Sequence, residues 1–231
     1  PLGVIGIALG SILLPRLSEK TVLNNPQKMN EAVQECLKIA AMLTIPATAA
    51  LLIIPLPLIS VLFERGAFSN VDSQFTARAL AIYGFGLPAY VLHKIFTPIF
   101  FSNGDTTTPF KIAVIAMLTN VLIAFSLIKF FGYLAPVIST TVSSWIMAIL
   151  LYKKSRFLGF KMSLALLNPF IKILVATAIL SAILILVSFE YFDLLTTSHL
   201  RTLYLFLLIL FSSSTYFCVL WFLGITNKKG N

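Results

Sequence analysis

The chain has 231 residues, of which 11% are charged, whereas ordinary soluble domains carry about 25%. Hydrophobic residues make up 58% of the chain and its mean hydropathy is +0.96, which is more apolar surface than a soluble core of this length could bury. This composition excludes a disordered chain and a disulfide scaffold, and it predicts an all-α, polytopic membrane protein. The net charge of +9 suggests a nucleic-acid partner, which has to be tested against membrane topology.

Apolar stretches between the charges predict the membrane spans, because a helix needs about 20 residues to cross about 30 Å of hydrocarbon. Residues 2–14 come first, and they are too few to cross before Pro15 and Arg16 end the run. The chain also starts at Pro1 without the basic region of a signal peptide, so we expect a truncated span and the C-terminal fragment of a longer protein. Six later stretches are long enough to cross: residues 39–63, 79–101, 112–128, 130–152, 173–189 and 202–225.

The distribution of positive charge predicts the orientation. Six crossings place the first loop and the C-terminus on the same side of the membrane, and that side collects 12 of the 17 Lys and Arg residues. Four lie on the opposite side, and Lys94 lies within a span. Because positive residues gather on the cytoplasmic side, the C-terminus is predicted to be cytoplasmic. The basic excess therefore indicates membrane orientation and contact with anionic lipids, and it does not indicate nucleic acid.

The spans divide the chain into four predicted regions. Residues 1–17 are the remnant of a transmembrane helix, and residues 18–38 are a cytoplasmic loop and an amphipathic helix. Residues 39–161 form a bundle of four spans, and residues 162–231 form a C-terminal transmembrane pair with a cytoplasmic tail. The C-terminal pair has few polar groups, which favours a hydrophobic groove or a partner-facing surface, with a passive scaffold as the alternative.

The amphipathic helix is predicted from its start signal and its periodicity. Asn25 suits the N-cap and Pro26 suits the first helical position. An apolar stripe follows, made of Met29, Val33, Leu37 and Ala40. We expect this helix to lie along the cytoplasmic interface before turning into the first full span, either as a lever that couples two halves of a transporter or as a simple anchor.

Several prolines lie inside or at the edges of the spans, where each removes a backbone donor and tends to kink its helix. Bent helices favour a transporter that opens alternately to two sides, although channels and receptors also contain them. The residues are Pro46, Pro55, Pro57, Pro88, Pro98 and Pro136.

Two features could contact a charged substrate. Lys94 is well inside a span, where it either faces a cavity or extends its ammonium to the cytoplasmic headgroups. Residues 102–109 form a predicted cytoplasmic turn, in which Thr108 can cap the next helix and Asp105 either caps locally or binds a neighbouring loop. The hydroxyl-rich residues 139–144 could line a watery path, but such hydroxyls commonly satisfy their own backbone, which favours a packing role.

Catalytic signatures are absent from the sequence. It contains two Cys and two His, without CxxC, HExxH or a glycine-rich phosphate loop. We therefore expect no enzyme activity, no cofactor and no metal site.

Three ordered motifs resemble the MurJ/MviN lipid II flippase family, and the resemblance extends over essentially the whole chain. Residues 2–10 (LGVIGIALG) and 13–18 (LLPRLS) are similar to its eighth span, and residues 62–68 (LFERGAF) are similar to its external turn after the ninth span. The third motif consists of residues 94–98 (KIFTP) and 105–111 (DTTTPFK).

This resemblance implies a fold of the MOP superfamily with fourteen spans, in two six-helix lobes and an extra C-terminal pair. The chain would hold the end of span eight and spans nine to fourteen, so that an N-terminal lobe upstream would be its partner. The family moves an undecaprenyl-pyrophosphate-linked peptidoglycan precursor across the bacterial inner membrane by alternating access. Its last two spans form a groove thought to hold the lipid tail, which fits the apolar character of residues 164–223.

The resemblance also indicates candidate substrate contacts. Lys94, Asp105 and Lys111 match charges in the family pattern, whereas the family's cavity arginines lie before the segment where this chain begins. Three alternatives stay open. They are another exporter of the same superfamily (a polysaccharide-lipid flippase or a drug or ion antiporter), a non-transporting scaffold for cell-wall enzymes, and a membrane enzyme.

Overall fold

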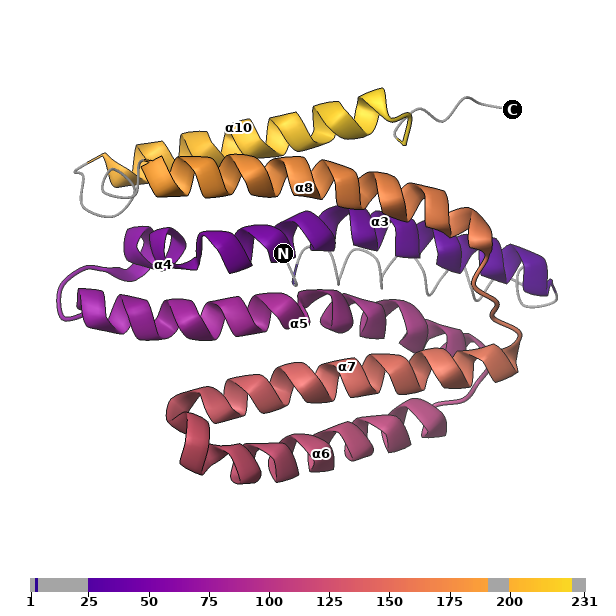
Figure 1. Cartoon of the computed structure of the whole chain (residues 1–231). Helices are drawn as coiled ribbons and strands as arrows, with labels where there is room; N and C mark the ends of the chain where they lie inside the picture. The colour runs from indigo at the N-terminus through magenta and orange to yellow at the C-terminus, as the bar shows by residue number, and fades with distance from the viewer. Residues whose placement is uncertain (1–2, 4–24, 191–199, 226–231) are drawn as a thin grey trace. The chain divides into compact units, whose positions relative to one another are not determined.

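The structure is a computed structural model that describes residue 3, residues 25–190 and residues 200–225 (Figure 1). Every regular element in those ranges is helical, which confirms the predicted all-α class. The truncated first span and the cytoplasmic tail after residue 225 lie outside the described residues. The helices are α3 (Pro26–Ile53), α4 (Pro55–Phe63), α5 (Asn70–Ser102), α6 (Thr107–Phe131), α7 (Ala135–Ser155), α8 (Leu167–Glu190) and α10 (Arg201–Phe222), with short 3-10 turns at Gly132–Leu134, Arg156–Leu158 and Leu164–Leu166.

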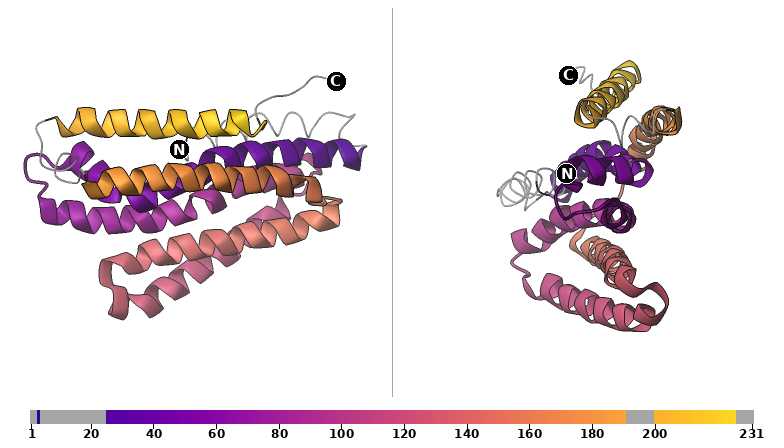
Figure 2. Two further views of the ribbon diagram at one scale, coloured as in Figure 1. Left: turned by 45° about the horizontal axis from the view of Figure 1, so that its top comes forward. Right: turned by 90° about the vertical axis from the view of Figure 1, so that its left-hand side faces the viewer.

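Five continuous helical segments of the described chain are long and apolar enough to cross a membrane. One of them, Thr107–Leu158, has 52 residues and contains two helices, because the turn at Gly132–Leu134 reverses the chain between α6 and α7. α6 and α7 then run side by side as an antiparallel hairpin (Figure 1, Figure 2). Helices of 25 and 21 residues extend about 37 Å and about 31 Å, so each could cross hydrocarbon by itself. The count of six spans stays a prediction.

The predicted span over residues 39–63 is not one helix, and this corrects the sequence interpretation. α3 ends at Ile53 and α4 begins at Pro55, with Ile54 between them at φ −118° and ψ 42°. Pro55 and Pro57 have no N–H to donate to the carbonyls four residues earlier, so the helical ladder cannot continue through this segment. Two closely spaced prolines therefore break the helix, where a single proline at position 46 stays inside it.

The predicted turn between an interfacial helix and the first full span is also not present. α3 runs without interruption from Pro26, and its 28 residues extend about 42 Å, which exceeds the thickness of hydrocarbon. The predicted N-cap is confirmed, because the Asn25 side chain accepts the backbone N–H groups of Gln27 and Lys28 at 3.0 and 3.3 Å. The predicted apolar stripe is buried as expected, at Met29, Val33, Leu37 and Ala40.

The described helices belong to two compact units, and the division cuts across the four predicted regions. The first unit contains Pro1–Thr44 and Phe85–Leu167, and the second contains Ile45–Gly84 and Asn168–Asn231. α3 and α5 each contribute residues to both units, because the boundaries fall within these two helices. The boundaries of the four predicted regions therefore stay predictions.

Aromatic packing holds the first unit together near the end of α7. The rings of Phe96, Tyr152 and Phe160 form a mutual cluster with centroids 5.8 to 6.2 Å apart. The amide of Asn30 secures the segment that follows α7, because it donates to the Gly159 carbonyl at 3.3 Å and accepts the Lys161 N–H at 2.8 Å. The start of α3 is thereby fixed to the connection that leads out of α7.

In the second unit, α8 and α10 each bury only a narrow row of side chains along one face. α10 buries residues spaced three or four apart, which are Leu205, Leu208, Ser212, Tyr216 and Leu220. α5 approaches α3 closely at Gly84, where an added Cβ would come within 2.7 Å of the Leu51 Cβ. Most other side chains of α8 and α10 are apolar and exposed, as expected of helices whose outer faces meet lipid or another part of a membrane protein.

Candidate functional site

The turn between α5 and α6 places Asp105 at the start of a helix. Gly104 adopts φ +74°, which reverses the chain after Ser102. Asp105 Oδ1 then accepts the backbone N–H of Thr108 at 2.9 Å. Of the two roles predicted for Asp105, the structure shows the local cap. The prediction that Thr108 itself caps α6 is wrong, because the helix begins at Thr107 and the Thr108 N–H is the group that is capped.

Hydrogen bonds at this turn favour the ionised form of Asp105. They lower the pKa of its carboxyl below the usual value, mainly through the Thr108 side chain and then through the Thr108 backbone, and Lys111 adds a smaller attraction. Of the three predicted site residues, Asp105 and Lys111 are close enough for a weak electrostatic attraction, but no ion pair joins them. The turn presents a capping carboxylate, and Lys111 is exposed on the first turns of α6.

Lys94 is separate from that pair. It is exposed on α5, eight residues before Ser102 and therefore about 12 Å along the helix from its end. Within the described ranges no hydrogen bond or ion pair joins it to Asp105 or Lys111. Its neighbour His93 is packed, with Nε2 2.7 Å from the Ser144 carbonyl oxygen and its ring edge-on to Tyr90.

The hydroxyl-rich stretch of α7 satisfies its own backbone, as the packing interpretation expected. Ser143 and Ser144 both donate to the Thr140 carbonyl, at 3.0 and 2.7 Å, and Thr140 donates to the Pro136 carbonyl at 2.7 Å. Ser139 differs because its hydroxyl also reaches Asn120 Oδ1 on α6 at 2.7 Å. Ser139 and Thr140 therefore join α7 to Asn120 of α6, whereas the hydroxyls of Ser143 and Ser144 are satisfied within α7.

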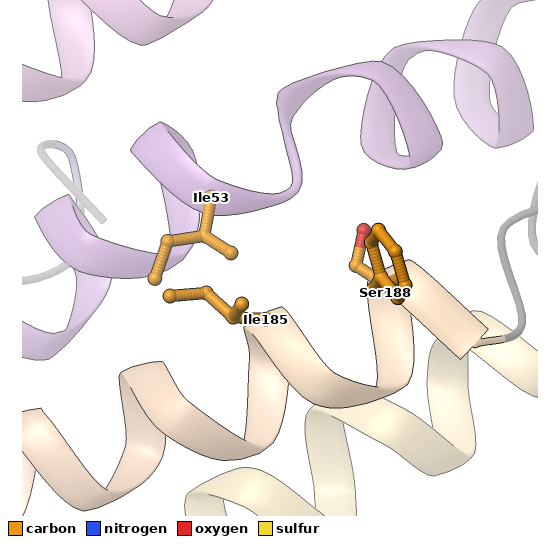
Figure 3. A pocket seen from close by; sticks show the side chains of 4 residues that line it. Ile53, Ile185 and Ser188 are labelled. Carbon is orange, nitrogen blue, oxygen red and sulfur yellow. The ribbon is translucent and has the colours of Figure 1, made fainter.

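An apolar cavity of about 350 Å³ lies in the second unit, between the end of α3 and the last turns of α8. Ile53 and Ile185 point toward each other across it, and Ser188 and Phe189 complete its lining (Figure 3). A hydrocarbon chain is the ligand that such a lining suits, because methyl and phenyl groups offer it dispersion contacts without requiring a polar partner. The cavity is consistent with the hydrophobic groove expected from the apolar C-terminal pair.

The sequence did not indicate an ion pair between Glu64, directly after α4, and Arg201, at the start of α10. Glu64 Oε1 lies 3.6 Å from Arg201 Nη1, and the other guanidinium nitrogen donates to the Glu64 carbonyl oxygen at 2.9 Å. The second carboxylate oxygen accepts the Ser73 hydroxyl at 2.7 Å. Glu64 thus connects the ends of α4, α5 and α10. Its position inside the LFERGAF motif was the available signal, but no pattern in the sequence indicated Arg201 as its partner.

No group of three His, Cys, Asp or Glu side chains that could hold a metal ion occurs in the described ranges. The arrangement found there is a set of apolar helices with isolated charges near helix ends. Such an arrangement is chemically suited to contact with an amphiphile.

Comparison with known proteins agrees with this arrangement. The family model described as lipid II flippase MurJ matches residues 1–206. A probable lipid II flippase MurJ of Rhizobium meliloti is 35% identical over 228 residues, which are 97% of this chain and 43% of the relative. Another of the same name from Rickettsia prowazekii is 31% identical over 203 residues, which are 87% of this chain and 40% of that relative.

A solved structure shares the fold. It is that of a lipid II flippase MurJ in the inward closed conformation, with a TM-score of 0.75 at 22% identity, and the match covers 95% of this chain and 43% of the other. The chain therefore spans about two fifths of the length of the curated relatives that it matches.

Proposed function

The chain belongs to the lipid II flippase MurJ family, and we propose that it forms the second-lobe spans and the C-terminal pair of a flippase for lipid II. The family match over residues 1–206 carries this proposal. The protein is a multi-pass membrane protein, and its proposed action is alternating access in the bacterial inner membrane. No covalent chemistry is involved, so its residues bind and guide the substrate.

The physical task explains why charged and apolar features occur together. A pyrophosphate that crossed hydrocarbon unaided would lose its hydration at a very high cost in free energy. A polar path for the headgroup reduces that cost, and an apolar groove lets the lipid tail stay in a hydrocarbon environment. The cavity lined by Ile53, Ile185, Ser188 and Phe189 supports the tail part of this proposal.

Lys94, Asp105 and Lys111 are the proposed substrate and transport residues. Lys94 supplies a cation within a span, where an ionisable side chain is a functional candidate by default. Asp105 caps the start of α6, and Lys111 follows on the first turns of that helix. The remaining headgroup contacts are proposed to come from an N-terminal lobe, in accordance with the two-fifths coverage of the relatives.

The proposed orientation has the C-terminus in the cytoplasm. The 12 and four Lys and Arg residues on the two sides of the predicted topology support it. Cysteine labelling from either side of the membrane at Lys153 and Lys129 tests it, because these two positions at the ends of α7 and α6 should be labelled from opposite sides.

A lipid II accessibility assay tests the function. In cells depleted of the full-length protein, external lipid II should fall, and the full-length wild-type gene should restore it. The variant Lys94→Gln should restore less, whereas Lys153→Gln removes an exposed ammonium at the end of α7 and should restore it fully. Normal external lipid II in depleted cells that have no second flippase would contradict the proposal.

A further inference from the structure

A second cavity, of about 330 Å³, lies in the second unit between the first turn of α4 and the first third of α5. Unlike the apolar cavity near α8, it contains a cation and an amide. Its lining consists of Pro55, Leu56, Gln74, Ala77, Arg78 and Ala81. Gln74 and Arg78 are four positions apart on a helix, so their side chains extend from the same face.

Among the residues that line this cavity, Arg78 carries the only charge, and its guanidinium has no hydrogen-bond or ion-pair partner in the described part of the chain. Its side chain is exposed. The neighbouring arginines differ from it. Arg65 donates to the Val61 carbonyl at 3.4 Å, and Arg201 is paired with Glu64. The guanidinium of Arg78 is therefore available to a polar group from outside the described residues.

The position of Arg78 along α5 suits a lipid headgroup. α5 has 33 residues and extends about 50 Å, which is about 20 Å more than the hydrocarbon thickness. Arg78 lies eight residues, or about 12 Å, from the first residue of the helix. The span predicted over residues 79–101 begins one residue after Arg78, so the guanidinium is expected at the boundary between headgroups and hydrocarbon, where lipid phosphates are found.

The residues around Arg78 leave room for such a group. Ala77 and Ala81 lie on either side of Arg78 in the sequence and give the cavity small side chains where larger ones would fill it. Gln74 uses its amide to donate to the Asn70 side chain at 2.9 Å, which leaves its second N–H for another acceptor. The guanidinium and the amide N–H can donate to phosphate oxygens, and the apolar residues of the lining can contact the hydrocarbon chain attached to that phosphate.

We propose that this cavity binds the phosphate of a membrane lipid, with Arg78 as the bidentate donor and Gln74 as a second donor. The ligand is a pyrophosphate-linked polyprenol or an anionic phospholipid, since both present the same group at the same depth. The site is distinct from the apolar cavity near α8 and from Lys94. It gives the α4–α5 hairpin a role in holding lipid.

Binding by the full-length protein tests the proposal. The protein is placed in nanodiscs of phosphatidylcholine, and the dissociation constants for undecaprenyl pyrophosphate and for phosphatidylglycerol are measured in separate titrations. Arg78→Gln should raise the dissociation constant for at least one of them about tenfold, the effect of losing one charge-assisted pair. Arg65→Gln, which removes an equal charge next to α4 but outside the cavity lining, should leave both unchanged.

A variant that fills the cavity distinguishes binding inside it from a general attraction of anionic lipid by the charge of Arg78. Ala81→Leu keeps the guanidinium but fills the cavity, so it should weaken binding to a similar degree, and Arg78→Lys should be intermediate because it keeps the charge and loses the bidentate fork. An effect on the pyrophosphate alone assigns the site to the prenyl substrate, and an effect on phosphatidylglycerol alone assigns it to a bilayer lipid. Unchanged dissociation constants in Arg78→Gln, or an effect equalled by Arg65→Gln, would overturn the proposal. The measurement involves no transport, so its outcome is independent of the lipid II accessibility assay.

Discussion

α6 and α10 differ in the charge at their first turn: an aspartate precedes α6, whereas an arginine begins α10. Both helix starts carry the same partial positive charge. The first N–H groups of a helix have no intrahelical acceptor and produce a partial positive charge, which an acidic residue stabilises. Asp105 meets this requirement before α6 by accepting the Thr108 N–H. α10 instead begins at Arg201, a cation in the position where an anion would be favourable.

The difference is explained by a partner that is distant in the sequence. Glu64 is separated from Arg201 by 137 positions, and it supplies both a carboxylate and a carbonyl oxygen to the guanidinium. At its other end α10 follows the ordinary preference, because the Lys172 ammonium donates to the Leu223 carbonyl at 2.7 Å. Both ends of α10 are therefore stabilised by side chains from outside the helix: Glu64 compensates the unfavourable cation at its start, and Lys172 of α8 supplies a favourable cation at its end.

The largest expected effect comes from removing the carboxylate that compensates Arg201. Glu64→Gln should lower the free energy of unfolding by about 1 to 2 kcal/mol, because it leaves a partly buried guanidinium at a helix start and weakens the acceptor of the buried Ser73 hydroxyl. Thermal unfolding of the full-length protein in detergent measures it. Glu31→Gln on the exposed face of α3 is the control and should change stability by less than about 0.5 kcal/mol. Equal losses in the two variants would contradict this account of Arg201.

Exchanging the two charges should be less harmful than removing either one. Arg201→Gln alone should cost about 1 kcal/mol, since the hydrogen bond to the Glu64 carbonyl is lost with the ion pair. The double variant Glu64→Arg with Arg201→Glu restores the pair and places an anion at the start of α10, which the dipole favours. A double-mutant cycle in low and high salt should therefore show a coupling that weakens with salt. No coupling at low salt would show that the carboxylate and the guanidinium act separately.

The opposite end of α10 should respond more weakly. Lys172→Met removes one donor to a helix carbonyl but leaves no charge uncompensated, so we expect a loss of about 0.5 to 1 kcal/mol. Protection of the last turn of α10 in hydrogen–deuterium exchange should fall, while protection of its first turn stays unchanged. Loss of protection along the whole helix would mean that Lys172 holds more than the last turn.

The smallest effect is expected at Asp105, where the difference in stability between the wild type and Asp105→Asn depends on pH. Hydrogen bonding lowers the pKa of this carboxyl in the folded state, so its contribution to stability is present above the unfolded pKa of about 3.9 and is lost as the pH falls through the folded value. Asp105→Asn should therefore be less stable than the wild type at pH 7, and the two should converge as the pH falls below about 4. Thermal unfolding from pH 3.5 to pH 7 measures this, and a difference independent of pH would show that the ionised carboxylate is not the stabilising group.

Several features of the fold could be predicted from local sequence alone. The N-cap at Asn25 and the stripe from Met29 to Ala40 follow from side-chain chemistry and helical periodicity, and both are confirmed. The break at Ile54 was missed, because hydropathy treats residues 39–63 as one apolar run although Pro55 and Pro57 together remove two donors from the helical ladder. The sequence does contain the signal for that break, but each proline taken separately predicts only a kink.

The candidate site was less predictable because most of its contacts join residues that are far apart in the sequence. Asp105 acts over three residues, and its capping role was one of the two predicted alternatives. The contacts of Glu64 with Arg201 and of Asn30 with Gly159 join residues more than 100 positions apart, and no periodicity connects them. The cavity that contains Arg78 likewise depends on tertiary structure, because residues of both α4 and α5 line it.

The sequence by itself determined the membrane class, the helical elements and the family motifs, because hydropathy, capping and proline geometry operate within a few residues. The tertiary structure alone decided which charges are compensated and which face a cavity. Arg65, Arg78 and Arg201 are the same residue type within one compact unit, yet one donates to a carbonyl at the end of α4, one lines a cavity and one pairs with a carboxylate. The physical reason is that the energy of a charge near a membrane depends on what surrounds it in space, and helices brought together by packing supply those surroundings.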